Sequence, residues 1–276
     1  MWRRAVALTT TLSLLTACSL PPAPTTPSVA SDRPLNVGVG TDIPGLAVLN
    51  ADTHERLGFD VDLYRWLAHN TSPEFTPVEV DVTIADRVNA IAQGRVQLVV
   101  SVFSITDERR GKIAFAGPYL LSKQGFMVRS DFDQPIRTLD DLTGRTVCTQ
   151  SGSTSYNQLT TGALRNRVTT TTEIGTRQCV ERLLRNQVDV ASTDEIVLRG
   201  FALQNPALKV LDLTFGAQER YGVGLPKNDR ALCERMSEGI KGFITNGAWD
   251  QFFRANFGDL APSGYKPDPF RLDPCT

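Results

Sequence analysis

The chain has 276 residues, 41% of them hydrophobic, so it is long enough for two modest domains and can bury a sizeable core. Its net charge of −1 gives no electrostatic reason to expect a nucleic-acid partner. The two histidines do not form a Cys/His cluster at zinc-ligand spacing, so we expect neither a metal site nor a cofactor.

The first 32 residues have the pattern of an export signal followed by a tether. A charged start and an apolar stretch lead to Leu15-Thr16-Ala17-Cys18, which matches the lipoprotein cleavage box. We expect residues 1–17 to be a signal peptide and Cys18 to be lipidated, which would anchor the protein to the outer face of the cell membrane. An ordinary signal peptide with an incidental cysteine is the alternative. The Pro-rich residues 18–32 would form the tether.

Strand and helix patterns then alternate along the chain. Strands are predicted at 35–40, 78–82 and 96–102, and helices at 59–69 and 84–93, where apolar residues recur at helical spacing. No run after the signal is long and apolar enough to span a bilayer. The alternation predicts an α/β protein with a mostly parallel sheet.

The same alternation starts again at Phe126. Its predicted elements are strands at 126–128, 144–148 and 188–191, a return crossing at 221–226, and helices at 138–142, from Tyr156, around 181–185, at 232–244 and at 249–257. Two rounds of strand and helix are equally compatible with two sequential domains and with one domain inserted into another.

The polar segment after the strand at 96–102 is the first candidate site. Thr106 is a credible helix N-cap, and the acidic residues 107–108 suit the positive end of a helix. Arg109 opposes the helix dipole there, so an anion such as a small carboxylate could offset the cost. Alternatively, Arg109 pairs with the neighbouring acids or points into water.

The order of motifs adds a family resemblance. G-F-D-V-D-L at 58–63 precedes S-I-T-x-E-R at 104–109 and A-F-A-G-P-Y at 114–119. In this order and spacing, from about Leu35 to Phe257, the chain resembles the polar amino-acid-binding proteins of ABC importers, solute-binding protein family 3. It is most similar to the lipid-anchored glutamine/glutamate/aspartate-binding type of actinobacteria.

This resemblance implies a two-lobe periplasmic-binding-protein fold of type II. Lobe 1 would comprise residues 33–120 and 221–262, and lobe 2 residues 121–220. Two connecting strands, near Leu120–Gln124 and Ala217–Tyr221, would form the hinge. Residues 263–276 would be a C-terminal tail.

The resemblance also places five side chains at the family's binding positions. Arg109 would bind the α-carboxylate of an amino acid and Asp194 its ammonium group. Ser104 lies just before Arg109, as does the backbone of Val102. Ser153 and Thr154 begin a lobe 2 helix, where capping and ligand binding are compatible roles.

The chain departs from the family around the ligand side chain. Gly45 and Ile84 stand where many members have aromatic residues, and Gln150 replaces a lysine of glutamine binders. Arg87 matches an arginine of glutamate/aspartate binders; either it is a solvated surface residue or it turns into the cleft and binds a side-chain carboxylate. Asp42 could also reach the cleft and oppose an acidic side chain.

The four cysteines after Cys18 allow three disulfide pairings. With the lobe limits that the resemblance implies, Cys148 and Cys179 lie in lobe 2, Cys233 lies in lobe 1 and Cys275 lies in the tail. A bond between the lobes could obstruct the hinge. We therefore predict Cys148–Cys179 and Cys233–Cys275.

The function that the resemblance implies is that of a monomeric, non-catalytic receptor. It would capture aspartate or glutamate, with asparagine or glutamine next, by hinge closure, and deliver the ligand to an ABC permease with its ATPase. A sensor that signals to a membrane partner would need the same cleft. A dehydratase on this fold would need a general acid or base, and neither His54 nor His69 falls at a matched position.

Overall fold

The computed structural model describes residue 2 and residues 33–275, and residues 33–275 belong to one compact unit. Cys18 lies outside the described residues, as does the rest of the predicted tether. Of the predicted signal peptide, only Trp2 is described. Within the described part of the chain, no helix has the length and apolar character needed to cross a membrane.

An eight-stranded mixed sheet is the backbone of the fold, with strand order β5-β1-β6-β11-β7-β10-β8-β9. A small antiparallel sheet, β2-β3-β4, lies apart from it. The elements in chain order are β1 (Arg33–Val39), β2 (Asp42–Ile43), β3 (Ala47–Leu49), β4 (Arg56–Leu57), α1 (Phe59–Asn70), β5 (Phe75–Asp81), α2 (Arg87–Ala92), β6 (Leu98–Val99), α3 (Asp107–Arg110), β7 (Ala114–Arg129), the 3-10 helix η1 (Leu139–Leu142), β8 (Thr146–Gln150), α4 (Thr154–Thr161), β9 (Thr169–Glu173), α5 (Thr176–Leu184), β10 (Val190–Asp194), α6 (Glu195–Gln204), β11 (Leu208–Leu225), α7 (Arg230–Thr245) and α8 (Ala248–Phe257).

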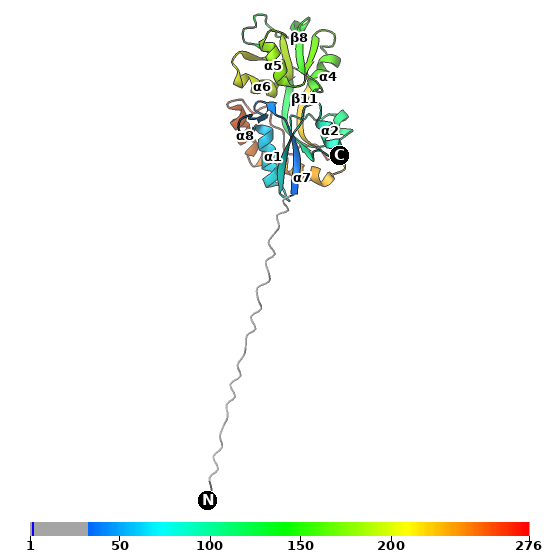
Figure 1. Ribbon diagram of the computed structural model, residues 1–276, viewed down its shortest axis with the longest axis vertical. Helices are drawn as coiled ribbons and strands as arrows, with labels where there is room; N and C mark the ends of the chain where they lie inside the picture. The colour runs from blue at the N-terminus through cyan, green and yellow to red at the C-terminus, as the bar shows by residue number, and fades with distance from the viewer. Residues whose placement is uncertain (1, 3–32, 276) are drawn as a thin grey trace. The chain divides into compact units, whose positions relative to one another are not determined.

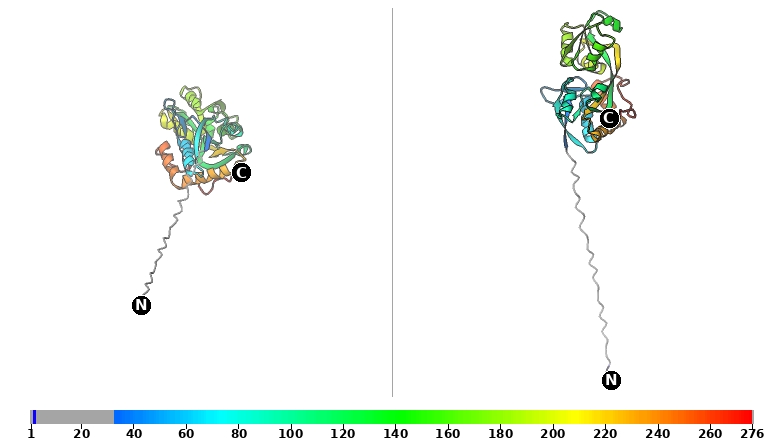
Figure 2. Two further views of the ribbon diagram at one scale, coloured as in Figure 1. Left: turned by 60° about the horizontal axis from the view of Figure 1, so that its bottom comes forward. Right: turned by 90° about the vertical axis from the view of Figure 1, so that its right-hand side faces the viewer.

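Two lobes share this sheet through the long strands β7 and β11. Figures 1 and 2 show α1, α2, α7 and α8 around one half of the sheet and α4, α5 and α6 around the other. Between the halves, β7 and β11 run antiparallel, and Tyr221 pairs with Leu120, Arg220 with Leu121 and Glu219 with Ser122. The chain thus leaves the first lobe on β7 and returns on β11. The exact lobe limits given above stay a prediction.

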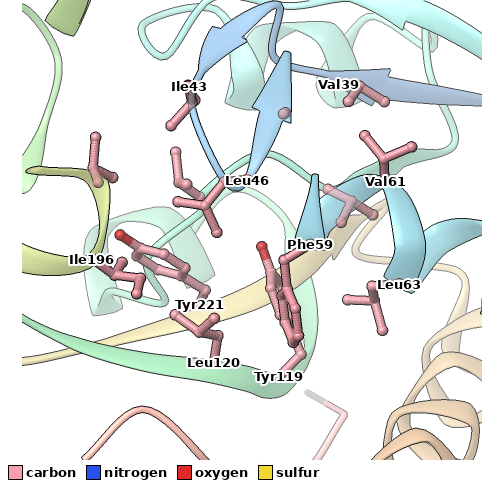
Figure 3. Close-up of a cluster of buried hydrophobic side chains, with 14 of the residues drawn as sticks. Val39, Ile43, Leu46, Phe59, Val61, Leu63, Tyr119, Leu120, Ile196 and Tyr221 are labelled. Atoms are coloured by element: carbon pink, nitrogen blue, oxygen red, sulfur yellow. The ribbon is translucent and has the colours of Figure 1, made fainter. Parts of the chain in front are cut away.

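The inner strands β6 and β10 are buried along their whole length, as expected for strands that are covered on both faces. In the first lobe, α1, α7 and α8 pack on one another, and β7 packs against α7. In the second lobe, Phe126 of β7 and Phe215 of β11 stack with ring centroids 4.6 Å apart. Figure 3 shows Tyr119 of β7 and Tyr221 of β11, where the two long strands pass between the lobes, beside Leu46 and Leu120.

Both disulfides have the predicted partners. Cys148–Cys179 joins β8 to α5 with Cα atoms 5.5 Å apart, and Cys233–Cys275 joins α7 to the tail with Cα atoms 5.8 Å apart. Neither bond links a residue of the second lobe to the first, so neither restrains the two halves directly.

Several element predictions were wrong in extent. The strand predicted at 96–102 is only β6, because the backbone leaves the sheet after Val99 and takes a left-handed conformation at Val102, with φ 43°. The strand predicted at 126–128 is the C-terminal end of β7. The helix predicted from Ile84 begins at Arg87.

Candidate functional site

A cavity lies between the lobes, close to where β7 and β11 pass from one lobe to the other. Its free volume is about 20 Å³. Six of the eight predicted ligand-binding residues line it. The lining residues are Ile43, Ile84, Arg87, Val102, Ser104, Gln150, Ser153, Thr154, Ser155, Thr176, Thr193, Asp194 and Val197.

The first-lobe wall is fixed by a buried carboxyl group. Asp60, in the first turn of α1, accepts hydrogen bonds from the backbone N–H of Val102 and from the Tyr119 hydroxyl, both at 2.8 Å. Burial raises the pKa of Asp60 to about 7, although both hydrogen bonds lower it. These bonds hold Val102 in its left-handed conformation, which costs about 1–3 kcal/mol in a β-branched residue.

Arg87 lies inside the protein, so the interpretation of it as a solvated surface residue is wrong. It is 2% exposed. Its Nε donates to the Ile84 carbonyl at 3.0 Å and its Nη1 to the Ser101 and Val102 carbonyls, both at 2.7 Å. Nη2 has no hydrogen bond to any residue that the structure describes. The Nε and Nη1 groups of the guanidinium are thus held by backbone carbonyls, and the Nη2 group remains to donate to a ligand.

Arg109 reaches across the edge of the same cavity. Its backbone N–H donates to the Thr106 hydroxyl, the predicted N-cap of α3. Its Nη1 donates to the Ser104 carbonyl at 2.7 Å, and its Nη2 to the carbonyl of Gly152 in the second lobe at 3.3 Å. Burial lowers the pKa of Arg109, while Glu219 and Asp194 raise it. Arg109 therefore borders the cavity rather than lining it, and it joins the lobes.

A buried acidic group faces the two arginines from the second lobe. Asp194 accepts hydrogen bonds from Gln124 Nε2 at 2.7 Å and from the Tyr221 hydroxyl, and the same Gln124 nitrogen contacts Glu219 Oε1 at 2.7 Å. Burial and the Glu219 charge raise the pKa of Asp194 to about 8. A ligand cation beside Asp194 would offset both effects.

Ser153 and Thr154 line the cavity from the start of α4. Ser153 Oγ accepts the Tyr156 N–H at 3.1 Å and donates to the Gln150 carbonyl at 2.6 Å, so it caps the helix. Thr154 Oγ1 lies 3.1 Å from Gln124 Nε2. Capping fixes both residues at the cavity wall.

Asp42 lies outside this cavity, in a neighbouring pocket between the same lobes. Its carboxylate forms an ion pair with Arg177 of α5. The pair links β2 to the second lobe. Asp42 therefore does not oppose the side chain of a ligand inside the cavity, and its charge is balanced by an arginine.

Sequence reasoning missed the residues that support the site rather than line it. Asp60 stands in the quoted G-F-D-V-D-L motif, where an acid among apolar helix positions signals a buried partner. Gln124, Glu219 and Tyr221 belong to the hinge strands, and only the fold brings them to Asp194. Among the described residues, no group of three or more His, Cys, Asp or Glu side chains could hold a metal ion.

Known proteins match the chain along nearly all of the two lobes. Residues 35–259 match the bacterial extracellular solute-binding proteins, family 3. A glutamate-binding protein, GluB of Corynebacterium efficiens, is 30% identical over 240 residues, covering 81% of this chain and 79% of GluB. A glutamine-binding protein of Geobacillus stearothermophilus is 30% identical over 205 residues, covering 74% of this chain and 76% of that protein.

Solved structures agree with this sequence match. An ancestral arginine-binding protein bound to arginine superposes with a TM-score of 0.74 at 26% identity, covering 82% of this chain and 98% of that protein. The likeness includes both lobes and the strands between them. The chain belongs to the bacterial extracellular solute-binding proteins of family 3 and has the two-lobe fold of type II periplasmic binding proteins.

Proposed function

We propose that this protein is a non-catalytic, monomeric receptor that captures a free polar amino acid between its lobes and delivers it to an ABC importer. One observation carries the proposal. Arg87 of the first lobe and Asp194 of the second, both buried, line one cavity, and the half-buried Arg109 of the first lobe lies at its border. An amino acid has charges of both signs, and a dry cleft must satisfy both.

The two ends of the ligand have separate partners in this proposal. Arg109 binds the α-carboxylate bidentately, exchanging its contact with the Gly152 carbonyl for the ligand. Asp194 accepts the ammonium group, assisted by the hydroxyl of Ser104. Since the partners belong to different lobes, the ligand stabilises the closed arrangement by contacting both.

The side-chain preference follows from Arg87. Its unpaired Nη2 suits a second carboxylate, and Gln150 and Thr176 add neutral polar groups to the lining. We therefore expect aspartate and glutamate to bind best, asparagine and glutamine next, and basic or aliphatic amino acids most weakly. The glutamate and glutamine named for the two relatives support this order.

A thermal-shift screen of the twenty amino acids tests the function, because a ligand that binds only the folded state raises its Tm. Calorimetry with Arg87→Ala then tests the preference: the variant should lose at least tenfold more affinity for aspartate than for asparagine, since it removes a charged donor. Arg95→Ala is the matched control, because Arg95 is paired with Asp86 on the surface. Equal losses for both ligands would show that Arg87 does not contact the side chain, and no Tm rise with any amino acid would contradict the function.

The attachment to the membrane is the second part of the proposal. Lipidation at Cys18 would keep the receptor beside its permease on the outer face of the membrane. Cys18→Ala should release the protein from the membrane fraction or leave it unprocessed, and metabolic labelling with a fatty acid should fail. A labelled, membrane-bound variant would contradict the anchor without affecting the ligand proposal.

A further inference from the structure

The C-terminal tail, described for residues 263–275, is attached to the first lobe at several points. It lies beyond the family match, which ends at residue 259. The Cys233–Cys275 disulfide fixes its end to α7, and Lys266 forms an ion pair with Asp250 of α8. These contacts are on the helical face of the lobe.

Two further contacts take the tail to the hinge. The Leu121 N–H of β7 donates to the Tyr265 carbonyl at 2.8 Å, and the Asp273 N–H donates to the Gly117 carbonyl at 2.6 Å. Gly117 and Leu121 lie on either side of the point where β7 leaves the first lobe. The tail therefore follows the connecting strand across the hinge.

The Asp273 carboxylate joins two elements that flank the cavity. One oxygen pairs with Arg220 of β11, and the other with Arg110 of α3. Asp273 is 14% exposed, Arg110 21% and Arg220 38%, so this network is screened less by water than a surface pair.

Both partners of Asp273 are next to residues of the site. Arg110 follows Arg109 on the four-residue helix α3. Arg220 follows Glu219, and its carbonyl accepts the Ile105 N–H at 2.8 Å. The segment that carries Ser104 and Arg109 is thus held to β11 by this backbone bond near its start and by Asp273 near its end.

We propose that Asp273 is a positioning residue for ligand binding: it ties α3 to the hinge strand β11 so that the Arg109 guanidinium meets the ligand carboxylate as the lobes close. The proposal rests on the proposed function, since it takes Arg109 as a ligand contact. A short helix such as α3 has little stability of its own, and its position depends on what it is tied to.

Asp273→Asn keeps the size of the side chain and removes its charge. We expect the variant to bind its best amino acid about tenfold more weakly, chiefly through faster dissociation, measured by calorimetry and stopped-flow fluorescence. Asp273→Glu should recover part of the loss. Lys266→Met, which removes another ion pair of the tail, is the control and should leave affinity unchanged.

A double-mutant cycle separates positioning from a general loss of stability. If Asp273 acts through Arg109, then Asp273→Asn should cost little further affinity in an Arg109→Lys background. Additive losses would overturn the proposal, as would an unchanged affinity in Asp273→Asn alone. If the parent protein binds no amino acid, the proposed function itself fails. If the parent binds and the Asp273 variants have the same affinity as Lys266→Met, only the positioning role fails.

Discussion

Asp194 is the residue whose protonation should control ligand binding. With a pKa of about 8 it is mostly neutral at pH 7 in the ligand-free protein. A bound ammonium group favours the carboxylate and lowers this pKa, so binding at pH 7 should release a proton. Affinity should therefore rise between pH 6 and pH 8, by up to about tenfold per unit, and level off above pH 8.

Calorimetry at pH 7 in phosphate and in Tris measures the released proton, because the two buffers differ in ionisation enthalpy. Asp194→Asn should bind more weakly and show a smaller pH dependence than the parent over this range. Heats that agree between the buffers would show that Asp194 keeps its protonation state when the ligand binds.

Individual side chains show where sequence reasoning reaches its limit. The family resemblance, rather than strand and helix patterns alone, assigned Ser104, Ser153 and Asp194 to a binding site, and the structure places all three at the cavity wall. The environment of Arg87 could not be predicted, because its partners are the carbonyls of Ser101 and Val102 on another segment.

At the scale of elements, α6 of the second lobe lies close to the turn after β2 of the first lobe. A Cβ atom at Gly200 would lie 1.9 Å from the Pro44 carbonyl oxygen. We predict that Gly200→Ala disfavours the closed arrangement and lowers amino-acid affinity at least tenfold, with no change in the cavity lining. The Tm of the ligand-free protein should fall little, because alanine favours a helix by about 1 kcal/mol over glycine.

The control for this variant is Leu203→Ala on the same helix, since Leu203 is exposed. Small-angle scattering should show that Gly200→Ala adopts a more open form with ligand present. An affinity equal to that of the parent would mean that α6 and Pro44 do not need to approach for binding.

Elements were predictable where one local signal was strong. The start of α3 was given by Thr106, and α1, α7 and α8 by their apolar spacing. The lengths of β7 and β11 were not, because a strand that passes between two lobes changes neighbours along its course. The small sheet β2–β4 and the threonine-rich β9 have too little apolar alternation to stand out.

For the whole molecule, strand and helix alternation indicated an α/β protein but not the order of the sheet. The order depends on β11 returning beside β6 and β7, which pairs residues 79 to 125 positions apart, from Leu208 with Arg129 to Gly224 with Val99. The family resemblance supplied that information. The tail contacts of Asp273 lie beyond the matched residues, so the resemblance could not have indicated them.

The two disulfides also differ in when they can form. A chain that emerges N-terminus first presents residues 121–220, the predicted second lobe, before residues 221–275, so Cys148 and Cys179 can be oxidised while the first lobe is still incomplete. Cys233 must wait for Cys275, and Asp273 arrives with it. The disulfide of the second lobe can therefore form early, whereas the disulfide and ion pairs of the tail beside the hinge form only after the last residues have appeared.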